Sequence, residues 1–235
     1  MRELLYFELV HQGLETGLDE EISKYPGYAS LSEKDRKNTL DKMEQIYNEI
    51  WQEFNEELES LDFGAYSAVR VYQDGVLRVP KERIANITNR SENYQNPPFS
   101  IKRIRKLSTE GARNAKAVCS LMDKGAILEG TENPVWLILH CYYKELPVIL
   151  YRIPLLSEIL LDPIENLIFR KRDKFIAHTI DKTLKEGDLG ILFMGMDHMV
   201  DSYLPKDIEI QFYELIEENT FDELLELYTH LAGKD

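Results

Sequence analysis

Short apolar runs alternate with longer segments of helical periodicity, and this alternation limits the possible folds more than any other feature of the chain. The five runs span residues 4–10, 67–72, 126–129, 190–194 and 208–213. Between them, apolar residues recur every three or four positions, which is typical of amphipathic helices. Parallel strands need long crossover connections, and these are usually helical. The sequence therefore predicts an α/β fold with a mostly parallel sheet and helices on both faces.

The longest helical segment covers residues 32–61 and begins with Ser32, a residue type that caps helix N-termini well. Its apolar stripe consists of Leu40, Met43, Ile46, Tyr47, Ile50, Trp51, Phe54 and Leu58. We expect a helical insertion at about 30–61 within a single α/β domain of residues 1–235.

The remaining connections differ in character. Helices are expected at residues 101–124, 163–186 and 221–231. Residues 77–100 are polar and contain a Pro-Pro pair, which indicates an insertion or a mobile active-site loop. Residues 134–162 fit one or two helices, or a helix and a strand. Their apolar part, 134–161, indicates either packed interior or a homo-oligomer interface.

The charge, the N-terminal segment and the cysteine content bear on the partners and the location of the protein. A formal net charge of −14 repels nucleic-acid phosphates, so we expect no nucleic-acid binding. The N-terminal apolar run is interrupted by Glu3, Glu8 and His11, which argues against a signal peptide and against a membrane span. Only two cysteines are present, without a CxxC pair, so a reduced cytoplasmic compartment is expected.

Four of the predicted strands end in ionisable side chains. These are Glu8 and His11, then Asp74, then Glu129 and Glu132, and finally Asp197 and His198. The carboxyl ends of parallel strands share one edge of the sheet, where sites in this fold class lie. Two histidines and several carboxylates at such an edge can hold a divalent metal ion. The alternative is that strands simply leave the core through polar residues because loops are solvated.

Arg172 is a second indication of a functional site. It lies on the apolar stripe of the helix that precedes residues 190–194, four positions before Ile176. A buried guanidinium is unfavourable unless it is paired. Arg172 could form an internal salt bridge, or it could bind an anionic substrate or a developing oxyanion. His140, His178 and His230 are expected to be structural or solvated, and no nucleophile elbow, P-loop or GxGxxG motif is present.

The segment RDKFIAHTIDKTLKEGDLGILFMGMDHMVDSYLPKDIEI, within residues 170–212, resembles the C-terminal part of the TraB/PrgY/GumN-like family. That family includes the TIKI proteases and shares a fold group with the erythromycin esterase and ChaN-like proteins. Its Gly-x-x-His turn matches Gly195 to His198, whereas Glu8 to His11 lacks the glycine. Glu129 is the nearest match to a family glutamate. The resemblance implies an α/β fold with histidines and carboxylates at one end of the sheet, and metal-dependent hydrolysis in some members.

Three functions follow as hypotheses. The first is a metal-dependent hydrolase of a peptide, ester or phosphoester bond in a small-molecule or peptide substrate. Its metal ligands would be His11, His198 and Glu8, with Glu129, Glu132 and Asp197 as further catalytic carboxylates and Arg172 as charge stabiliser. The second is a small-molecule-binding sensory module without turnover. The third is an interaction subunit that uses the apolar segment 134–161.

Overall fold

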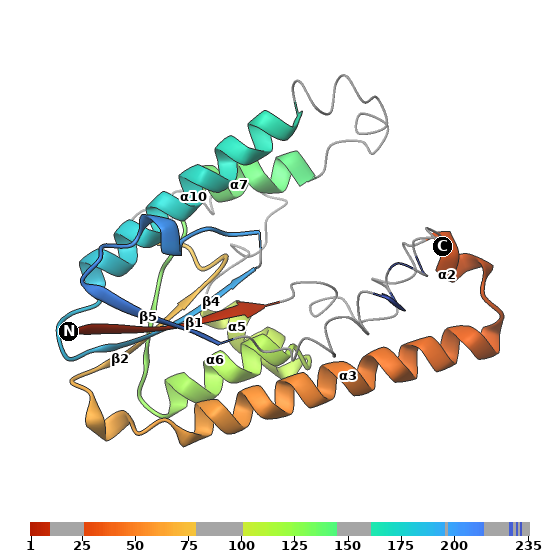
Figure 1. Cartoon of the computed structure of the whole chain (residues 1–235), viewed down its shortest axis with the longest axis horizontal. Helices are drawn as coiled ribbons and strands as arrows, with labels where there is room; N and C mark the ends of the chain where they lie inside the picture. The colour runs from red at the N-terminus through yellow and green to blue at the C-terminus, as the bar shows by residue number, and fades with distance from the viewer. Residues whose placement is uncertain are drawn as a thin grey trace.

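The computed structural model describes residues 1–9, 26–78, 101–144, 161–195 and 197–213, together with residues 226, 227, 229 and 231. Five strands form one sheet in the order β3-β2-β4-β1-β5, and every neighbouring pair is parallel (Figure 1). The strands are β1 (Arg2–Leu9), β2 (Val69–Gln73), β3 (Ile127–Glu129), β4 (Leu189–Gly195) and β5 (Ile208–Tyr213). The predicted parallel α/β sheet is confirmed, and all five strands lie within about two residues of the expected ranges.

The middle strand of the sheet is β4, and all seven of its residues are buried. Its sequence LGILFMG has no polar side chain, as expected for a strand covered on both faces. Gly190 is needed because a Cβ there would come within 2.6 Å of the Leu4 side chain on β1. The parallel pairing of Leu9 with Gly195 and of Gln73 with Phe193 places the carboxyl ends of β1, β2 and β4 beside one another.

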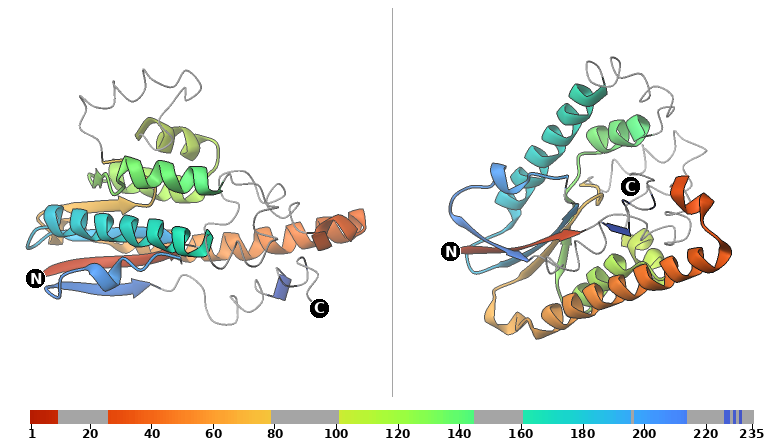
Figure 2. Two further views of the ribbon diagram at one scale, coloured as in Figure 1. Left: turned by 90° about the horizontal axis from the view of Figure 1, so that it is seen from above. Right: turned by 45° about the vertical axis from the view of Figure 1, so that its right-hand side comes forward.

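Helices cover both faces of the sheet, as predicted. Figures 1 and 2 show α10 (Asp162–Thr183) and α7 (Pro134–Lys144) on one side, and α3 (Glu33–Ser60), α5 (Ile101–Thr109) and α6 (Arg113–Asp123) on the other. Successive residues of a strand pack alternately against the helices on one face and on the other, because their side chains point to opposite faces of the sheet. Leu5 and Phe7 pack in the layer with α3 and α6, whereas Leu4 and Tyr6 pack in the layer with α10.

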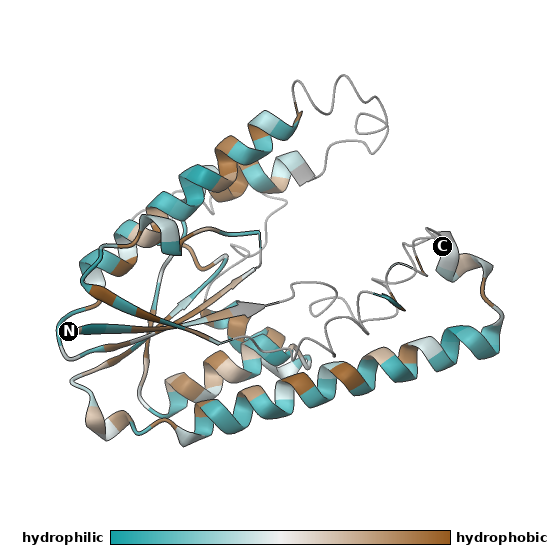
Figure 3. Ribbon diagram, in the orientation of Figure 1, coloured by the Kyte–Doolittle hydropathy of each residue, from teal (hydrophilic) through white to brown (hydrophobic). Residues whose placement is uncertain are grey.

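The long helix α3 is only partly an insertion. Ser32 caps it as predicted, accepting a hydrogen bond from the Asp35 backbone N–H at 3.2 Å. Its second half packs against the sheet through Trp51, Phe54 and Leu58, so this half is part of the crossover from β1 to β2. Its first half extends beyond the sheet and packs with α2 (Pro26–Ser30) and Leu231 (Figure 2). In Figure 3 hydrophilic residues (teal) and hydrophobic residues (brown) alternate along much of this helix.

The expectation of one helix over residues 101–124 is wrong, because two helices, α5 and α6, replace it. The break lies at Gly111, whose φ of 104° is accessible to glycine but rarely to other residues. By contrast, α10 follows the predicted 163–186 closely. Residues 79–100 and 145–160 lie outside the described residues, so the predicted mobile loop stays a prediction.

The helices that the structure describes are too short or too polar to cross a membrane. On α7 the apolar residues Val135, Ile138, Leu139 and Tyr142 are exposed, each by more than two fifths of its surface. The homo-oligomer interface expected over 134–161 stays a prediction.

The connections after β2 and β4 lead in opposite directions across the sheet. From β2 the chain continues to β3 on one side, whereas from β4 it continues past β1 to β5 on the other. Neighbouring strands with this property form a topological switch point, and ligands of open parallel sheets bind outside the strand ends there. The carboxyl ends of β2 and β4 are therefore where a site is expected.

Candidate functional site

Five ionisable side chains meet beside this switch point. Asp74 follows β2, Glu132 follows β3, Arg172 and Asp173 lie on α10, and His198 follows β4. Four of the five are at most 5% exposed as residues, namely Glu132, Arg172, Asp173 and His198. The Asp74 side chain is 17% exposed and is the most accessible member of this charged cluster.

Glu132 reaches the cluster because the chain after β3 runs against the turn after β2. The backbone N–H groups of Thr131 and Glu132 both donate to the Val76 carbonyl at 2.8 Å. Gly130 permits this approach, since a Cβ there would lie 2.7 Å from the Arg78 Cα. The result is a Glu132 side chain with no exposed surface.

Arg172 connects the acidic side chains. Its Nη2 donates to Asp74 Oδ1 and to Glu132 Oε1, both at 2.5 Å, and its Nε donates to Glu132 Oε1 at 3.1 Å. Its Nη1 lies 2.5 Å from Nδ1 of His140 on α7. Burial alone would lower the pKa of Arg172, but the charges of Asp74 and Glu132 raise it above its ordinary value. The prediction of a buried, carboxylate-paired Arg172 is confirmed, and the internal salt bridge is the alternative that the contacts support.

His198 is held by Asp173. Its Nδ1 lies 2.5 Å from Asp173 Oδ1, while Asp173 Oδ2 accepts the Met199 backbone N–H at 3.2 Å. The turn after β4 is fixed by a hydrogen bond from the His198 backbone N–H to the Gly195 carbonyl at 3.1 Å. Both carboxylate oxygens of Asp173 are therefore engaged, and the imidazole orientation is set from α10.

The second nitrogen of His198 faces Asp74, with Nε2 3.6 Å from Oδ2. Burial alone lowers the pKa of His198, but the hydrogen bond to Asp173 and the Asp74 carboxylate outweigh burial and raise it to about 9. Burial raises the pKa of Glu132 to about 7, with Arg172 opposing and Asp74 adding to the rise. The neighbouring carboxylates explain the raised pKa of His198, and burial explains the raised pKa of Glu132, the most buried acid of the cluster.

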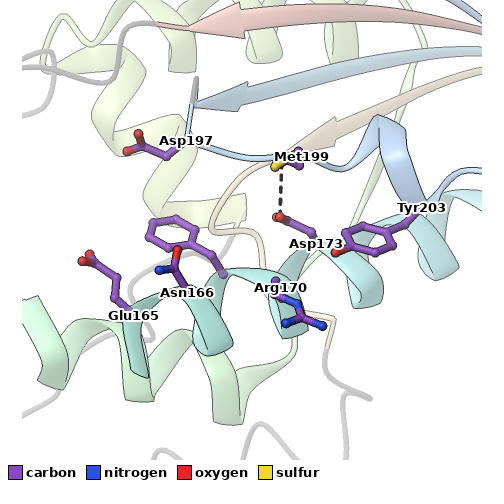
Figure 4. Close-up of a pocket in the computed structure, with 8 residues that line it drawn as sticks. Glu165, Asn166, Arg170, Asp173, Asp197, Met199 and Tyr203 are labelled. Carbon is purple, nitrogen blue, oxygen red and sulfur yellow. Dashed lines mark hydrogen bonds between the residues drawn. The ribbon is translucent and has the colours of Figure 1, made fainter. Parts of the chain in front are cut away.

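A cavity of about 430 Å³ lies beside the cluster, between α10 and the segment after β4. Its lining residues are Glu165, Asn166, Phe169, Arg170, Asp173, Asp197, Met199 and Tyr203. Figure 4 shows Asp197 projecting from the β4 side and Glu165 from α10, with the Arg170 guanidinium turned away from both. The Asp173 side chain thus joins the cavity wall to the His198 imidazole.

Three of the predicted carboxylates have described side chains, and they lie in three different places. Glu132 joins the cluster, whereas Asp197 is exposed and lines the cavity. Glu129 lies outside the cluster, because its Oε1 is 2.5 Å from Arg70 Nη1, and Arg70 also binds Asp188 just before β4. The side chain of Glu129, the last residue of β3, points to Arg70 and away from the cluster. The chain reaches the cluster three positions later, at Glu132.

The expected metal site stays a prediction. His11 lies outside the described residues, and for Glu8 only the backbone is described, paired with Met194. Among the residues that the structure describes, no group of three or more His, Cys, Asp or Glu side chains is arranged to hold an ion. Arg172 lies between Asp74 and Glu132, and His198 faces a carboxylate from each nitrogen. In this arrangement the described donors are paired with one another.

The sequence interpretation missed Asp173, which belongs to the cluster, and His140, which contacts the cluster through Arg172. Asp173 could have been found beside Arg172, because two adjacent charged residues on a buried helix face both need partners. His140 was expected to be structural. Its contact with Arg172 joins α7 to α10, and the spacing of apolar residues in the sequence gives no indication of such a contact. His178 is exposed, as predicted.

No protein family, curated protein or solved structure matches the chain. The resemblance to the TraB/PrgY/GumN-like family therefore stays a prediction.

Proposed function

We propose that the chain is a hydrolase that cleaves an uncharged ester or amide bond by acid–base catalysis at His198 and Asp74. The observation that carries the proposal is the arrangement of His198 between Asp173 and Asp74 at the switch point of the sheet. A general acid that its surroundings keep protonated, held beside a carboxylate that can serve as general base, is what hydrolysis requires.

In this reaction His198 is the proton donor. Its raised pKa of about 9 keeps the ring protonated at neutral pH, with one proton on the nitrogen that faces Asp74. Asp74 accepts a proton from the attacking water, the bond from the acyl carbon to the leaving atom breaks, and the leaving atom takes the Nε2 proton of His198. Asp74 then returns its proton to His198, because the two groups are 3.6 Å apart.

Charge argues for an uncharged substrate rather than a phosphoester. With one proton on Glu132 the cluster has no excess positive charge, and the neighbouring cavity adds Glu165 and Asp197 against Arg170. A phosphate anion would be repelled in such surroundings. Arg172 does not relieve this repulsion, because each of its three nitrogens already contacts Glu132, Asp74 or His140.

The test uses phenyl acetate and phenyl butyrate as neutral esters, because phenoxide is a basic leaving group that needs a proton, and phenyl phosphate as the anionic comparison. We expect ester turnover without phosphate-ester turnover. His198→Asn and Asp74→Asn should each reduce kcat by about 10²- to 10⁴-fold, the usual contribution of an acid or base. The proposal fails if His198→Asn stays folded and retains the wild-type rate.

Two controls separate catalysis from folding. Glu129→Gln removes one partner of a separate part-buried ion network, Arg70 with Glu129 and Asp188, which lies outside the site. His178→Asn removes an exposed histidine from the same helix as Arg172. Both variants should keep the rate of the wild-type enzyme, and circular dichroism should show the same fold in every variant.

A second candidate, a small-molecule-binding module, is favoured by the position of the cavity. The cavity wall includes Asp173 but neither His198 nor Asp74, so a ligand there contacts the site without reaching the proposed acid. Saturable binding of an ester that is never hydrolysed, measured by calorimetry and weakened by Asp173→Asn, would support this function instead.

A further inference from the structure

His140 lies outside the acid–base pair but contacts the residue that organises it. It sits on α7, and its Nδ1 is 2.5 Å from Nη1 of Arg172 on α10. We infer that His140 is a positioning residue that, as the neutral tautomer with its proton on Nε2, fixes Arg172 and through it the catalytic Asp74. Only the predicted effect on rate rests on the proposed hydrolase function.

The chemistry of the two side chains determines the tautomer. A guanidinium has N–H donors on every nitrogen and no acceptor, and it does not lose its proton in proteins. In a contact of 2.5 Å the shared proton therefore belongs to Arg172, and Nδ1 of His140 supplies the lone pair. A neutral imidazole that accepts at Nδ1 carries its own proton on Nε2. A second proton on Nδ1 would require Arg172 to move.

The positioning effect follows from how the guanidinium is held. Its Nη2 binds Asp74 and Glu132, its Nε binds Glu132, and its Nη1 contacts His140. A planar group held at three nitrogens by the segments after β2 and β3 and by α7 cannot rotate in its plane. Without His140 one of these contacts is lost, and the Arg172 contact that orients Asp74 becomes less defined.

Phe169 lies between the two histidines. Its ring centroid is 4.9 Å from that of His140 and 5.3 Å from that of His198, and the Arg172 guanidinium carbon is 5.7 Å away. Both histidine rings meet it edge-on, at interplanar angles of 60° and 76°. A change at His140 is therefore also transmitted through packing, so a test has to separate hydrogen bonding from bulk.

The first experiment determines the tautomer directly and needs no activity. In the full-length protein with ¹⁵N-labelled histidine, long-range ¹H–¹⁵N spectra distinguish Nδ1–H, Nε2–H and protonated rings. We expect His140, assigned by its loss in His140→Asn, to show a neutral ring with the proton on Nε2 from pH 6 to pH 8. A proton on Nδ1, or a ring that is protonated at pH 6, would overturn the inference.

The second experiment compares two replacements of similar size. In His140→Asn the Oδ1 atom can take the place of Nδ1, because both atoms are bonded to Cγ, so Arg172 keeps an acceptor. His140→Leu keeps the bulk beside Phe169 and removes the acceptor. We expect His140→Leu to lower kcat by about 10- to 100-fold, as small misplacements of catalytic groups do, while KM changes little. His140→Asn should stay within about threefold of the wild type.

A merely structural role gives a different result. If His140 only stabilises the fold, both variants lose thermal stability and the folded fraction keeps the wild-type kcat, which rejects the positioning role. Equal loss of kcat in the two variants also rejects it, because the acceptor would then be irrelevant. If the wild-type protein hydrolyses no ester, the hydrolase proposal fails, and the tautomer is still decided by the spectra.

Discussion

His198 and Asp173 are 25 positions apart in the sequence and meet with Nδ1 and Oδ1 2.5 Å apart, inside the protein. The pair joins the segment after β4 to the middle of α10, and neither side chain is more than 4% exposed. Together with Arg172, it makes α10 the element that holds the charges at the strand ends in place.

The stability of the protein should fall as pH rises. The pKa of His198 is raised from 6.5 to about 9 in the folded state, so its contribution is fully present below 6.5 and is lost as pH rises through 9. This difference between the unfolded and folded pKa of His198 corresponds to roughly 3 kcal/mol in the free energy of unfolding. Glu132, raised from 4.5 to about 7, acts in the same direction between those values.

Urea denaturation of the wild type and of His198→Asn at pH 6, 7.5 and 9.5 measures this effect. The difference in the free energy of unfolding between them should shrink at pH 9.5, whereas the difference for His178→Asn should be the same at each pH. A constant difference for His198→Asn would show that the imidazole is not charged in the folded protein.

Replacing Arg172 by methionine should be severely destabilising. The change leaves Asp74 and Glu132 without their shared cation, and removing one partner of a buried ion pair costs ~3–5 kcal/mol. The double variant Arg172→Met with Glu132→Gln should recover part of this loss, because one uncompensated charge disappears. Thermal and urea denaturation of the wild type, the two single variants and the double variant give a double-mutant cycle. If the two losses in the free energy of unfolding simply add, Arg172 and Glu132 do not interact directly.

Gly130→Ala should reduce stability by about 1–3 kcal/mol, the usual cost of overpacking. The added Cβ would lie 2.7 Å from the Arg78 Cα and from the Leu77 carbonyl oxygen, and backbone atoms cannot move aside easily. Gly64→Ala is the control, since its Cβ would meet only the Asp62 side chain, at 3.1 Å. Equal stability of the two variants would show that the chain after β3 is not held against the turn after β2.

The purified protein should retain no stoichiometric divalent metal, and chelation by EDTA should leave ester turnover unchanged. The reason is that the described donors are already committed to one another, with Arg172 between Asp74 and Glu132. Elemental analysis of the wild type and of His198→Ala decides the point. One equivalent of metal that disappears in His198→Ala would support the metal site predicted from His11 and His198 instead.

The sequence by itself determined the sheet, because a strand covered on both faces must be apolar throughout. The run LGILFMG of β4 has this pattern, and the Ser32 cap and apolar stripe of α3 likewise follow from local chemistry. Arg172 could be predicted to be buried and paired for the same reason, since a charge on an apolar helix face needs a partner.

Only the tertiary structure decided which partners meet. Glu129 and Glu132 are three positions apart, yet one binds Arg70 and the other Arg172, because the chain after β3 is packed against Val76 and Arg78. Similarly, the contact of His140 with Arg172 depends on how α7 lies against α10. Periodicity shows which face of an element is buried, whereas side-chain pairing depends on distances between elements that are remote in the sequence.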